Sequence, residues 1–420
     1  MSMIASPARL RLYGTPKTYA IFLRDFLTGR FNRGDAARVL ERNVASRLGQ
    51  GHAVAMPTCR MAIYSAIKSV IEPGQRVIMS PYTIVDVVNM VICAGGEPVF
   101  ADTAPNTCNA DEEEIERLLK VTENVGAVLV THFYGLMCDV PRVKKACDSH
   151  SVPLIEDAAQ AFGAHIDGHK AGTIGDIGCF SFGMYKIVNA FFGGMLTSDN
   201  PRIAETVRAD QESWPAETGV NYGKKLAQGF VTDVLTHPII FKSFTFWIFR
   251  YAYLHDVSSI NNQLRVDYNP QIKTALPTGY KRRLSAAQSR MIDRQLDGVV
   301  ANTEKRIKNA KRYHDGLKDI EELVLPPFSD RGDHIYTYYC PCVPDRTALV
   351  RYAKQHNRDI PENYHKNCAD LEIFRPYHAD CPNARRSAAG LIYLPTYPSY
   401  PASEIDKNIA VIRAFFGKDT

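Results

Sequence analysis

Two stretches decide how this chain folds: VPLIED at residues 152–157 and CFSFGMYKIVNAFFGGML at residues 179–196. The first is an apolar strand that ends abruptly in two carboxylates. In an open parallel sheet, ligands bind beyond the carboxyl ends of the strands, so we expect one of these acids to lie beside a ligand. Because side chains alternate along a strand, Glu156 and Asp157 should point to opposite sides. The alternative is that an acid here only caps a helix over residues 158–162.

The second stretch places Lys186 among aromatic and aliphatic neighbours. Poor hydration disfavours the charged ammonium and lowers its pKa, which suits a lysine that forms a Schiff base. Gly193 and Gly194 then supply a turn without side chains close to whatever Lys186 holds. The alternative is a lysine that extends from a half-buried strand to solvent. Together, an acid at a strand end and a lysine in an apolar pocket form the pair that pyridoxal phosphate (PLP) requires.

The sequence around these stretches alternates helical and strand patterns from about residue 51 to residue 197. Helices are predicted over 57–70, 84–94, from 111 onward and over 140–149, and strands over 76–80, 98–101, 125–131 and 152–156. This alternation predicts an α/β domain with a mainly parallel sheet covered by helices on both faces.

The remainder of the chain behaves differently. Helices are predicted over 284–317 and 403–416, and strands over 336–343 and 390–394. We therefore expect a large α/β domain over residues 1–270 and a smaller C-terminal α+β domain over residues 271–420.

The overall composition is that of an ordinary globular protein, with 420 residues, 45% of them hydrophobic, and a formal net charge of +5. This charge gives no evidence of nucleic-acid binding. The ten cysteines never form a Cys-x-x-Cys pair, so neither a zinc site nor a disulfide framework is indicated. No secretory signal is visible, and reduced thiols in the cytoplasm are expected.

One segment departs from this composition. Residues 229–254 read GFVTDVLTHPIIFKSFTFWIFRYAYL, with Asp233, Lys242 and Arg250 as their full charges. These charges and Pro238 divide the segment into pieces shorter than the roughly 20 apolar residues of a spanning helix. Two interpretations remain: a helical pair buried in the interior or in a dimer interface, which we favour, and an amphipathic surface in peripheral contact with a membrane.

Several ordered motifs carry a family resemblance. They are EDAAQAFGA at 156–164, AGTIGDIGCFSF at 171–182, Lys186 with its two glycines, PTCRMA at 57–62, HFYG at 132–135 and LPTYPSY at 394–400. In these motifs the chain resembles the DegT/DnrJ/StrS family of PLP-dependent sugar aminotransferases over about residues 51–415. The resemblance implies the aspartate-aminotransferase-like fold, fold type I, with a mainly parallel mixed sheet between helices and a smaller C-terminal domain.

The resemblance also implies functions for individual residues. Lys186 would be the Schiff-base lysine and Asp157 the partner of the pyridine nitrogen. Gln160, three residues on and on nearly the same helix face, would contact the phenolic oxygen or the ring. The reaction implied is transfer of an amino group from a donor, L-glutamate, to a nucleotide-linked keto-sugar in polysaccharide, lipopolysaccharide or amino-sugar biosynthesis.

The phosphate of the cofactor has its own expected set of residues. The resemblance implies that Ser181 binds it with its hydroxyl. Thr58 and Cys59 lie where the family uses backbone amides at a helix start, which the physics of helix termini supports. The alternative for Thr58 is a simple N-cap. An active site completed by a neighbouring subunit implies a homodimer with two-fold symmetry.

Three departures from the family pattern concern the surroundings of the cofactor. Phe191 and Phe192 replace a Gly-Glu pair, so that a polar loop becomes apolar. Ile84 occupies the position of the aromatic that stacks on the ring, with Tyr82 nearby as a substitute. Lys281 replaces an asparagine that contacts phosphate from the neighbouring subunit, and a lysine still reaches phosphate as a point charge. These changes affect the expected acceptor more than the cofactor, and a lipid-linked or otherwise apolar acceptor is one hypothesis.

Two other functions stay open. Sugar dehydration is an alternative, but the dehydratases of this family carry histidine in place of the Schiff-base lysine, and this chain retains Lys186. A non-catalytic PLP-binding regulatory protein is the other, because the loop glutamate and the stacking aromatic are missing. His132 is expected to order a loop rather than bind a metal, since no partner His or Cys has ligand spacing. The sequence does not identify the sugar.

Overall fold

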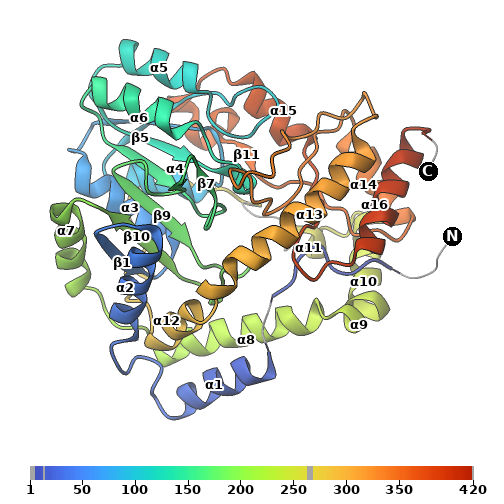
Figure 1. The fold of residues 1–420 in the computed structure, drawn as a ribbon, viewed down its shortest axis with the longest axis horizontal. Helices are drawn as coiled ribbons and strands as arrows, with labels where there is room; N and C mark the ends of the chain where they lie inside the picture. Colours follow the sequence, from blue (N-terminus) through green and yellow to red (C-terminus); the bar gives the residue numbers. More distant parts are fainter. Residues whose placement is uncertain (1–4, 13–14, 263–267, 419–420) are drawn as a thin grey trace.

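The computed structural model describes residues 5–12, 15–262 and 268–418. Within them, the central sheet has the strand order β1–β10–β9–β6–β5–β2–β4 (Figure 1). These strands are β1 (His52–Met56), β2 (Arg76–Met79), β4 (Glu97–Phe100), β5 (Val125–Thr131), β6 (Leu154–Asp157), β9 (Ile177–Ser181) and β10 (Gly194–Ser198). Neighbouring strands run parallel except at β10, which is antiparallel to β1 and β9. The predicted α/β class with a mainly parallel mixed sheet is confirmed.

Helices cover both faces of this sheet because side chains alternate along its buried strands. The covering helices are α2 (Ala36–Leu48), α3 (Cys59–Val70), α4 (Val85–Cys93), α5 (Glu112–Val121), α6 (Val140–Ser149), α7 (Pro201–Glu212) and α12 (Ala286–Asp293). Along β5, Ala127 and Leu129 enter a core shared with α3 and α4. Val128 and Val130 enter the opposite core, shared with α5 and α6. At the other end of the sheet, Phe180 packs into a core with α2 and α12.

A separate core lies in the C-terminal part of the chain. Its helices are α13 (Val299–Leu317), α14 (Arg346–Gln355) and α16 (Ala402–Phe415). The strands expected over 336–343 and 390–394 form isolated bridges instead, such as Tyr339 with Leu394. Pro341 lacks the N–H that a continuous ladder needs, which accounts for the difference.

Short elements connect these layers. They are α1 (Pro16–Leu27), α11 (Ser258–Asn261), α15 (Pro382–Gly390), the 3-10 turns η1 (Phe133–Gly135), η4 (Leu296–Gly298), η5 (Cys368–Asp370) and η6 (Glu372–Tyr377), and the strand pairs β3 (Tyr82–Thr83) with β11 (Lys366–Asn367) and β7 (His165–Ile166) with β8 (His169–Lys170).

The aromatic segment forms two helices. The first is the end of α8 (Gly219–Leu235), and the second joins α9 (Pro238–Ile240), the π-helical turn η2 (Phe241–Thr245) and α10 (Phe246–Leu254). Phe241 and Phe246 are buried, whereas Phe244 and Tyr251 are 61% and 60% exposed. The expected helical pair is therefore present but only half buried. Among the described residues, no helix is long and apolar enough to cross a membrane.

Candidate active site

Several strands end or begin together at the carboxyl edge of the sheet. β6 ends at Asp157 and β9 ends at Ser181, while the antiparallel β10 begins at Gly194. Gly194 pairs with both Met56, the last residue of β1, and Ser181. Lys186 lies in the turn between β9 and β10. The topology thus gathers the predicted residues at the edge where parallel sheets bind ligands.

Asp157 and Lys186 are the ionisable groups at the centre of this edge. Asp157 Oδ1 accepts the N–H of Ala159 at 3.0 Å and lies 3.7 Å from Cys59 Sγ. Burial raises the pKa of Asp157, although the hydrogen bond from Ala159 and the charge of Lys186 oppose this. Burial lowers the pKa of Lys186, although the charge of Asp157 opposes it. Each group therefore lies where its charged form is disfavoured.

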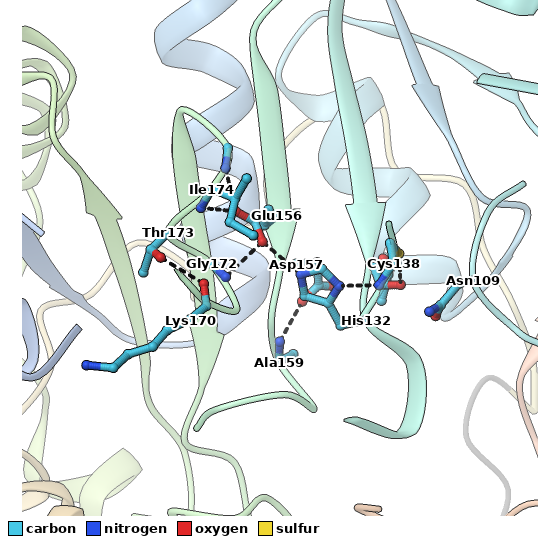
Figure 2. Close-up of polar contacts among 12 residues, drawn as sticks. Asn109, His132, Cys138, Glu156, Asp157, Ala159, Lys170, Gly172, Thr173 and Ile174 are labelled. Carbon is cyan, nitrogen blue, oxygen red and sulfur yellow. Dashed lines mark hydrogen bonds and ion pairs between the residues drawn. The ribbon is translucent and has the colours of Figure 1, made fainter. Parts of the chain in front are cut away.

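The neighbouring carboxylate, Glu156, is bound on the other side of the strand (Figure 2). Its Oε2 lies 2.9 Å from His132 Nε2, and both side chains are fully buried. The N–H of Cys138 donates to His132 Nδ1 at 3.2 Å, so Nε2 carries the proton and donates to Glu156. The N–H groups of Gly172 and Ile174 donate to Glu156 at 2.9 and 2.8 Å. Burial acts to raise the pKa of Glu156, but these hydrogen bonds hold it below its ordinary value.

Alternation along β6 thus separates the two acids as predicted, and His132 orders a loop as predicted. The helix expected over 158–162 is wrong, because these residues form a turn. The N–H of Ala158 still bonds to Cys179 O at 2.8 Å, so the chain follows β9 for one more residue before it turns. Gln160 consequently lies on no helix face. Its buried Oε1 accepts the N–H of Tyr134 at 3.2 Å.

The start of α3 lies against β10. Thr58 is the N-cap of α3, and its Oγ1 accepts a backbone N–H of the first turn at 3.3 Å. Gly194 passes so close that a Cβ there would lie 2.5 Å from the carbonyl carbon of Thr58 and 2.6 Å from the nitrogen of Cys59. Only glycine allows this approach. The hydroxyl of Ser181, on the adjacent strand, accepts the N–H of Gly183 at 3.3 Å.

Two glutamines hold the loop between β9 and β10. Gln288, on α12, donates from Nε2 to Ala190 O at 3.2 Å and also to Phe192 O. Gln295 accepts the N–H of Asn189 at 3.1 Å and donates to its carbonyl oxygen at 2.6 Å. These amide contacts fix the backbone of the loop that carries the lysine.

Phe191, one of the two loop residues that depart from the family pattern, is buried against helix α1. Its ring lies 5.9 Å from that of Tyr19 and 5.5 Å from that of Phe22, both on α1. A Cβ on Gly229 of α8 would come within 2.5 Å of the same ring. The apolar loop therefore packs directly on α1 and α8, so that this departure and the aromatic segment form one structural feature.

Tyr82 and Ile84, the two residues expected near the cofactor ring, differ from each other in burial and in contacts. Ile84 is the partly exposed N-cap residue of α4. Tyr82 is fully buried, and its hydroxyl lies 2.7 Å from that of Tyr134 and accepts a hydrogen bond from Asn363 Nδ2. The environment of Tyr82 is thus a buried polar cluster.

The sequence did not single out this cluster. Besides Tyr134 and Asn363 it contains His365, whose Nδ1 lies 2.8 Å from the hydroxyl of Tyr393. Burial and the nearby charge of Lys186 lower the pKa of His365 to about 3, so its imidazole is neutral. The pairing of β3 with β11 creates the cluster from segments 281 positions apart. No local pattern reveals such a contact.

A cavity adjoins Lys186 on the C-terminal side. Arg9 and Arg306 line it together with Lys186 and Tyr338. Arg306, on α13, is buried, and its Nη1 donates to Thr337 O at 3.2 Å. Arg11 also lines the cavity, and three arginines beside the amine make it suited to an anionic group.

Lys281 was expected to reach a neighbouring subunit. Within its own chain, its Nζ lies 3.7 Å from Oδ1 of Asp210, on α7. The side chain is 36% exposed.

The chemistry of these residues fits PLP. A half-buried amine with a lowered pKa suits covalent attachment of an aldehyde. A protonated ring nitrogen would offset the cost of burying the charge of Asp157. The helix start at Thr58 and the hydroxyl of Ser181 suit a phosphate.

Comparison with known proteins agrees with this fit. The model of the DegT/DnrJ/EryC1/StrS aminotransferase family matches residues 23–237 and 247–413. The chain is 26% identical over 400 residues to the spore coat polysaccharide biosynthesis protein SpsC of Bacillus subtilis, covering 92% of this chain and 91% of that protein. It is 25% identical over 401 residues to the dTDP-3-amino-3,4,6-trideoxy-alpha-D-glucose transaminase of Micromonospora megalomicea, with 92% and 91% covered.

The fold agrees as well. The structure of the E. coli GDP-4-keto-6-deoxy-D-mannose-3-dehydratase with bound hydrated PLP matches with a TM-score of 0.75 and 18% identity, over 97% of this chain and 100% of that one. The predicted fold type I is confirmed. Because the family match extends across both the sheet and the C-terminal core, the chain belongs to the DegT/DnrJ/EryC1/StrS aminotransferase family, whose cofactor is pyridoxal phosphate.

Proposed function

We infer that this enzyme transfers an amino group from L-glutamate to a nucleotide-linked keto-sugar. The observation that carries the proposal is the half-buried amine of Lys186, whose charge acts on the buried carboxylate of Asp157 at the carboxyl edge of the sheet. Relatives such as the dTDP-sugar transaminase support the class of acceptor. The family itself supports the class of reaction.

We assign the cofactor contacts as follows. Lys186 would hold PLP as a Schiff base, Asp157 would pair with its ring nitrogen, and Gln160 would contact its phenolic oxygen. Ser181, Thr58 and Cys59 would bind its phosphate, Ile84 and Tyr82 would serve the side of its ring, and Lys281 would serve the phosphate of the neighbouring subunit in a homodimer. The hydroxyl of Thr58 already caps α3, so Thr58 and Cys59 contribute backbone N–H groups.

Bound PLP supplies an electron sink that makes a proton on the donor's α-carbon acidic. Lys186 would do the proton transfer after the amine of the donor has replaced it on the cofactor. Its lowered pKa increases the share of the neutral amine, which takes the α-carbon proton as a general base. Asp157 would keep the ring nitrogen protonated. The glutamine contacts behind the loop keep the amine in place during the transfer.

The cations that line the cavity next to Lys186 support the binding of an anionic donor on this side of the amine. Arg306 donates charge-assisted hydrogen bonds to carboxylates more strongly than a neutral group does. It lies on the rigid helix α13, and Arg9 adds a second positive charge at the cavity wall. We therefore assign a carboxylate of L-glutamate to Arg306.

A nitrogen-labelled donor tests the proposal. The PLP-loaded enzyme is mixed with 15N-glutamate and a panel of nucleotide-linked keto-sugars, and products are analysed by mass spectrometry. We expect the bound cofactor's absorbance to shift on addition of glutamate and the label to appear in one sugar. A deoxygenated sugar without label would indicate a dehydratase. A cofactor that binds but does not respond to glutamate would indicate a regulatory protein.

Lys186→Ala is the matched variant for this experiment. It should abolish both the covalent absorbance band and label transfer, because Lys186 is the one lysine among the described residues that line the cavity. Lys318→Ala, a change on the exposed surface, should leave both unchanged. An unaltered absorbance band in Lys186→Ala would mean that another residue binds the cofactor.

A further inference from the structure

Exposed apolar side chains are concentrated on α1 and on the helices α8, α9, η2 and α10. Figure 1 shows α1 beside α8 along the lower edge of the molecule, with α9 and α10 at one end of α8. The exposed side chains are Leu23, Phe26, Leu27, Val220, Phe230, Val231, Leu235, Ile239, Phe244, Trp247, Ile248 and Tyr251. We call this set the α1/α8–α10 surface. Leu27 and Ile239 are 74% and 71% exposed, so these side chains lie in water in the isolated chain.

The fold does not need this surface for its own packing. Phe241 and Phe246, on the inner side of the second helix, already pack against Ala5 and Ala8 of the N-terminal segment. The outer side of the same helix exposes further apolar side chains, among them Ile239, Phe244 and Ile248. A cluster of exposed apolar side chains marks a surface that meets a second apolar environment. The family match leaves out residues 238–246, which lie within this helix.

The charges within these helices have one sign at the surface. The acidic residues in α1 and in 219–254 are Asp25 and Asp233, and both are buried. Asp25 is paired with Arg24 and Arg290, and Asp233 with Arg11. The cations of the same stretches are Lys17, Arg24, Lys224, Lys225, Lys242 and Arg250. Arg24, Lys225 and Lys242 form ion pairs with the buried Asp25, Glu217 and Glu404, so that Lys17, Lys224 and Arg250 are the cations of these helices without an ion pair among the described residues. The surface therefore combines apolar side chains with lysine and arginine and has no exposed carboxylate among its described residues.

We propose that the α1/α8–α10 surface binds the enzyme to an anionic phospholipid bilayer. Aromatic and aliphatic side chains enter the boundary between headgroups and acyl chains, and the cations meet lipid phosphates. A second copy of the chain fits less well, because a two-fold contact would place the same cations opposite one another with no carboxylate between them. The proposal goes beyond the proposed function and does not depend on the identity of the sugar.

Vesicle flotation of the full-length, PLP-loaded enzyme tests the proposal. Vesicles contain phosphatidylcholine alone or phosphatidylcholine with phosphatidylglycerol. We expect flotation with the anionic vesicles, binding to neutral vesicles weaker by about tenfold or more, and loss of the difference at high salt. Absence from both kinds of vesicle would overturn the proposal, as would equal binding to both.

The double variant Ile239→Ser/Phe244→Ser identifies the surface. It should weaken binding to anionic vesicles by about tenfold or more, because two anchoring side chains are lost. Its matched control is Val121→Ser/Val300→Ser, which changes residues that are 62% and 65% exposed on other helices. Circular dichroism and cofactor binding establish that each variant is folded. An equal loss in the control would refute the assignment.

A charge reversal gives an independent comparison. Lys224→Glu on α8 should weaken binding to anionic vesicles, whereas Lys318→Glu, outside this surface, should not.

Sedimentation without lipid distinguishes membrane binding from contact with a second copy of the chain. If Ile239→Ser/Phe244→Ser halves the mass of the particle, the surface is a contact between copies and the membrane proposal fails.

Discussion

At the scale of single residues, two adjacent acids on one strand have opposite energetic effects. Glu156 accepts hydrogen bonds from His132 and from backbone N–H groups in a buried site, which lowers its pKa. Glu156→Gln replaces an acceptor oxygen by an N–H₂ group that faces donors. We expect the free energy of unfolding of the apoprotein to fall by about 3 kcal/mol. Urea unfolding at pH 7 measures this, with the exposed Glu372→Gln as a control that should change little.

Asp157→Asn should behave in the opposite way. Because burial raises the pKa of Asp157 in the folded apoprotein, the charged form costs stability as the pH rises through this range. The variant should therefore be as stable as the wild type at pH 7 or more stable. Turnover should fall by roughly a hundredfold or more, since the ring nitrogen loses the anion that keeps it protonated. A loss of stability equal to that of Glu156→Gln would contradict this separation of functions.

Arg306 offers a test of donor binding at the same scale. Arg306→Gln should raise the KM for L-glutamate by about tenfold or more, because a charge-assisted hydrogen bond is lost. The KM for the sugar should change less. Arg312→Gln lies on the same helix but pairs with Asp406 at the surface, so it should leave both values unchanged. Equal effects on both substrates would indicate a structural role for Arg306. Steady-state kinetics with each substrate varied in turn give the values.

At the scale of elements, the packing of α8 on the lysine loop gives a comparison of two glycines. Glycine to alanine in an exposed helix position normally gains about 0.5–1 kcal/mol. At Gly219 the nearest side-chain atom is 3.9 Å from an added Cβ, so Gly219→Ala should be neutral or stabilising. At Gly229 the added Cβ would overlap the ring of Phe191, and Gly229→Ala should cost about 1–3 kcal/mol.

The same comparison reports on catalysis. Displacement of Phe191 moves the loop that follows Lys186, so Gly229→Ala should also lower kcat, whereas Gly219→Ala should not. Thermal unfolding and single-turnover kinetics measure the two effects. If both variants melt at the same temperature and react at the same rate, α8 does not position the loop.

The helices and strands also differ in how well the sequence predicts them. Apolar runs separated by amphipathic helices predict β2, β5 and β6 within a few residues, because local periodicity determines these elements. The helix expected after β6 is a turn, since the chain remains bonded to β9. The pairing of β3 with β11 and the position of His365 depend on contacts between distant segments. These contacts have no local signature, so the polar cluster was not predictable.

At the scale of the whole molecule, the N-terminal segment joins the C-terminal core to the active site. Ser6 donates its N–H to Asn357 O at 3.0 Å and accepts the N–H of Asp359 at 2.8 Å. The hydroxyl of Tyr397 donates to Ala8 O at 2.9 Å. Arg9 then lines the cavity that contains Lys186. Contacts at the C-terminal core therefore determine where residues 6–9 lie relative to the reacting amine.

Asp359 joins the N-terminal segment to the C-terminal core through Arg9 and Lys354. Its titration makes this contribution measurable as a dependence of stability on pH. It contacts Arg9 at 3.2 Å and Lys354 at 2.6 Å in a buried site. Burial alone would raise the pKa of Asp359, but these two cations lower it to about 2. This pKa lies below the pKa of an aspartate in the unfolded chain. The contacts of Asp359 with Arg9 and Lys354 therefore stabilise the folded protein above about pH 4, and this contribution is lost as the pH falls toward 2.

Asp359→Asn should therefore cost about 3–5 kcal/mol at pH 7, because Lys354 remains buried and Arg9 half-buried without a counter-charge. The difference from the wild type should shrink as the pH falls from 4 toward 2. Urea unfolding across this range measures both, with the exposed Asp380→Asn as a control. If the N-terminal segment also orders the cavity wall, the KM for L-glutamate should rise in Asp359→Asn and stay constant in Asp380→Asn. A variant that loses stability with an unchanged KM would show that the segment supports the fold without shaping the donor site.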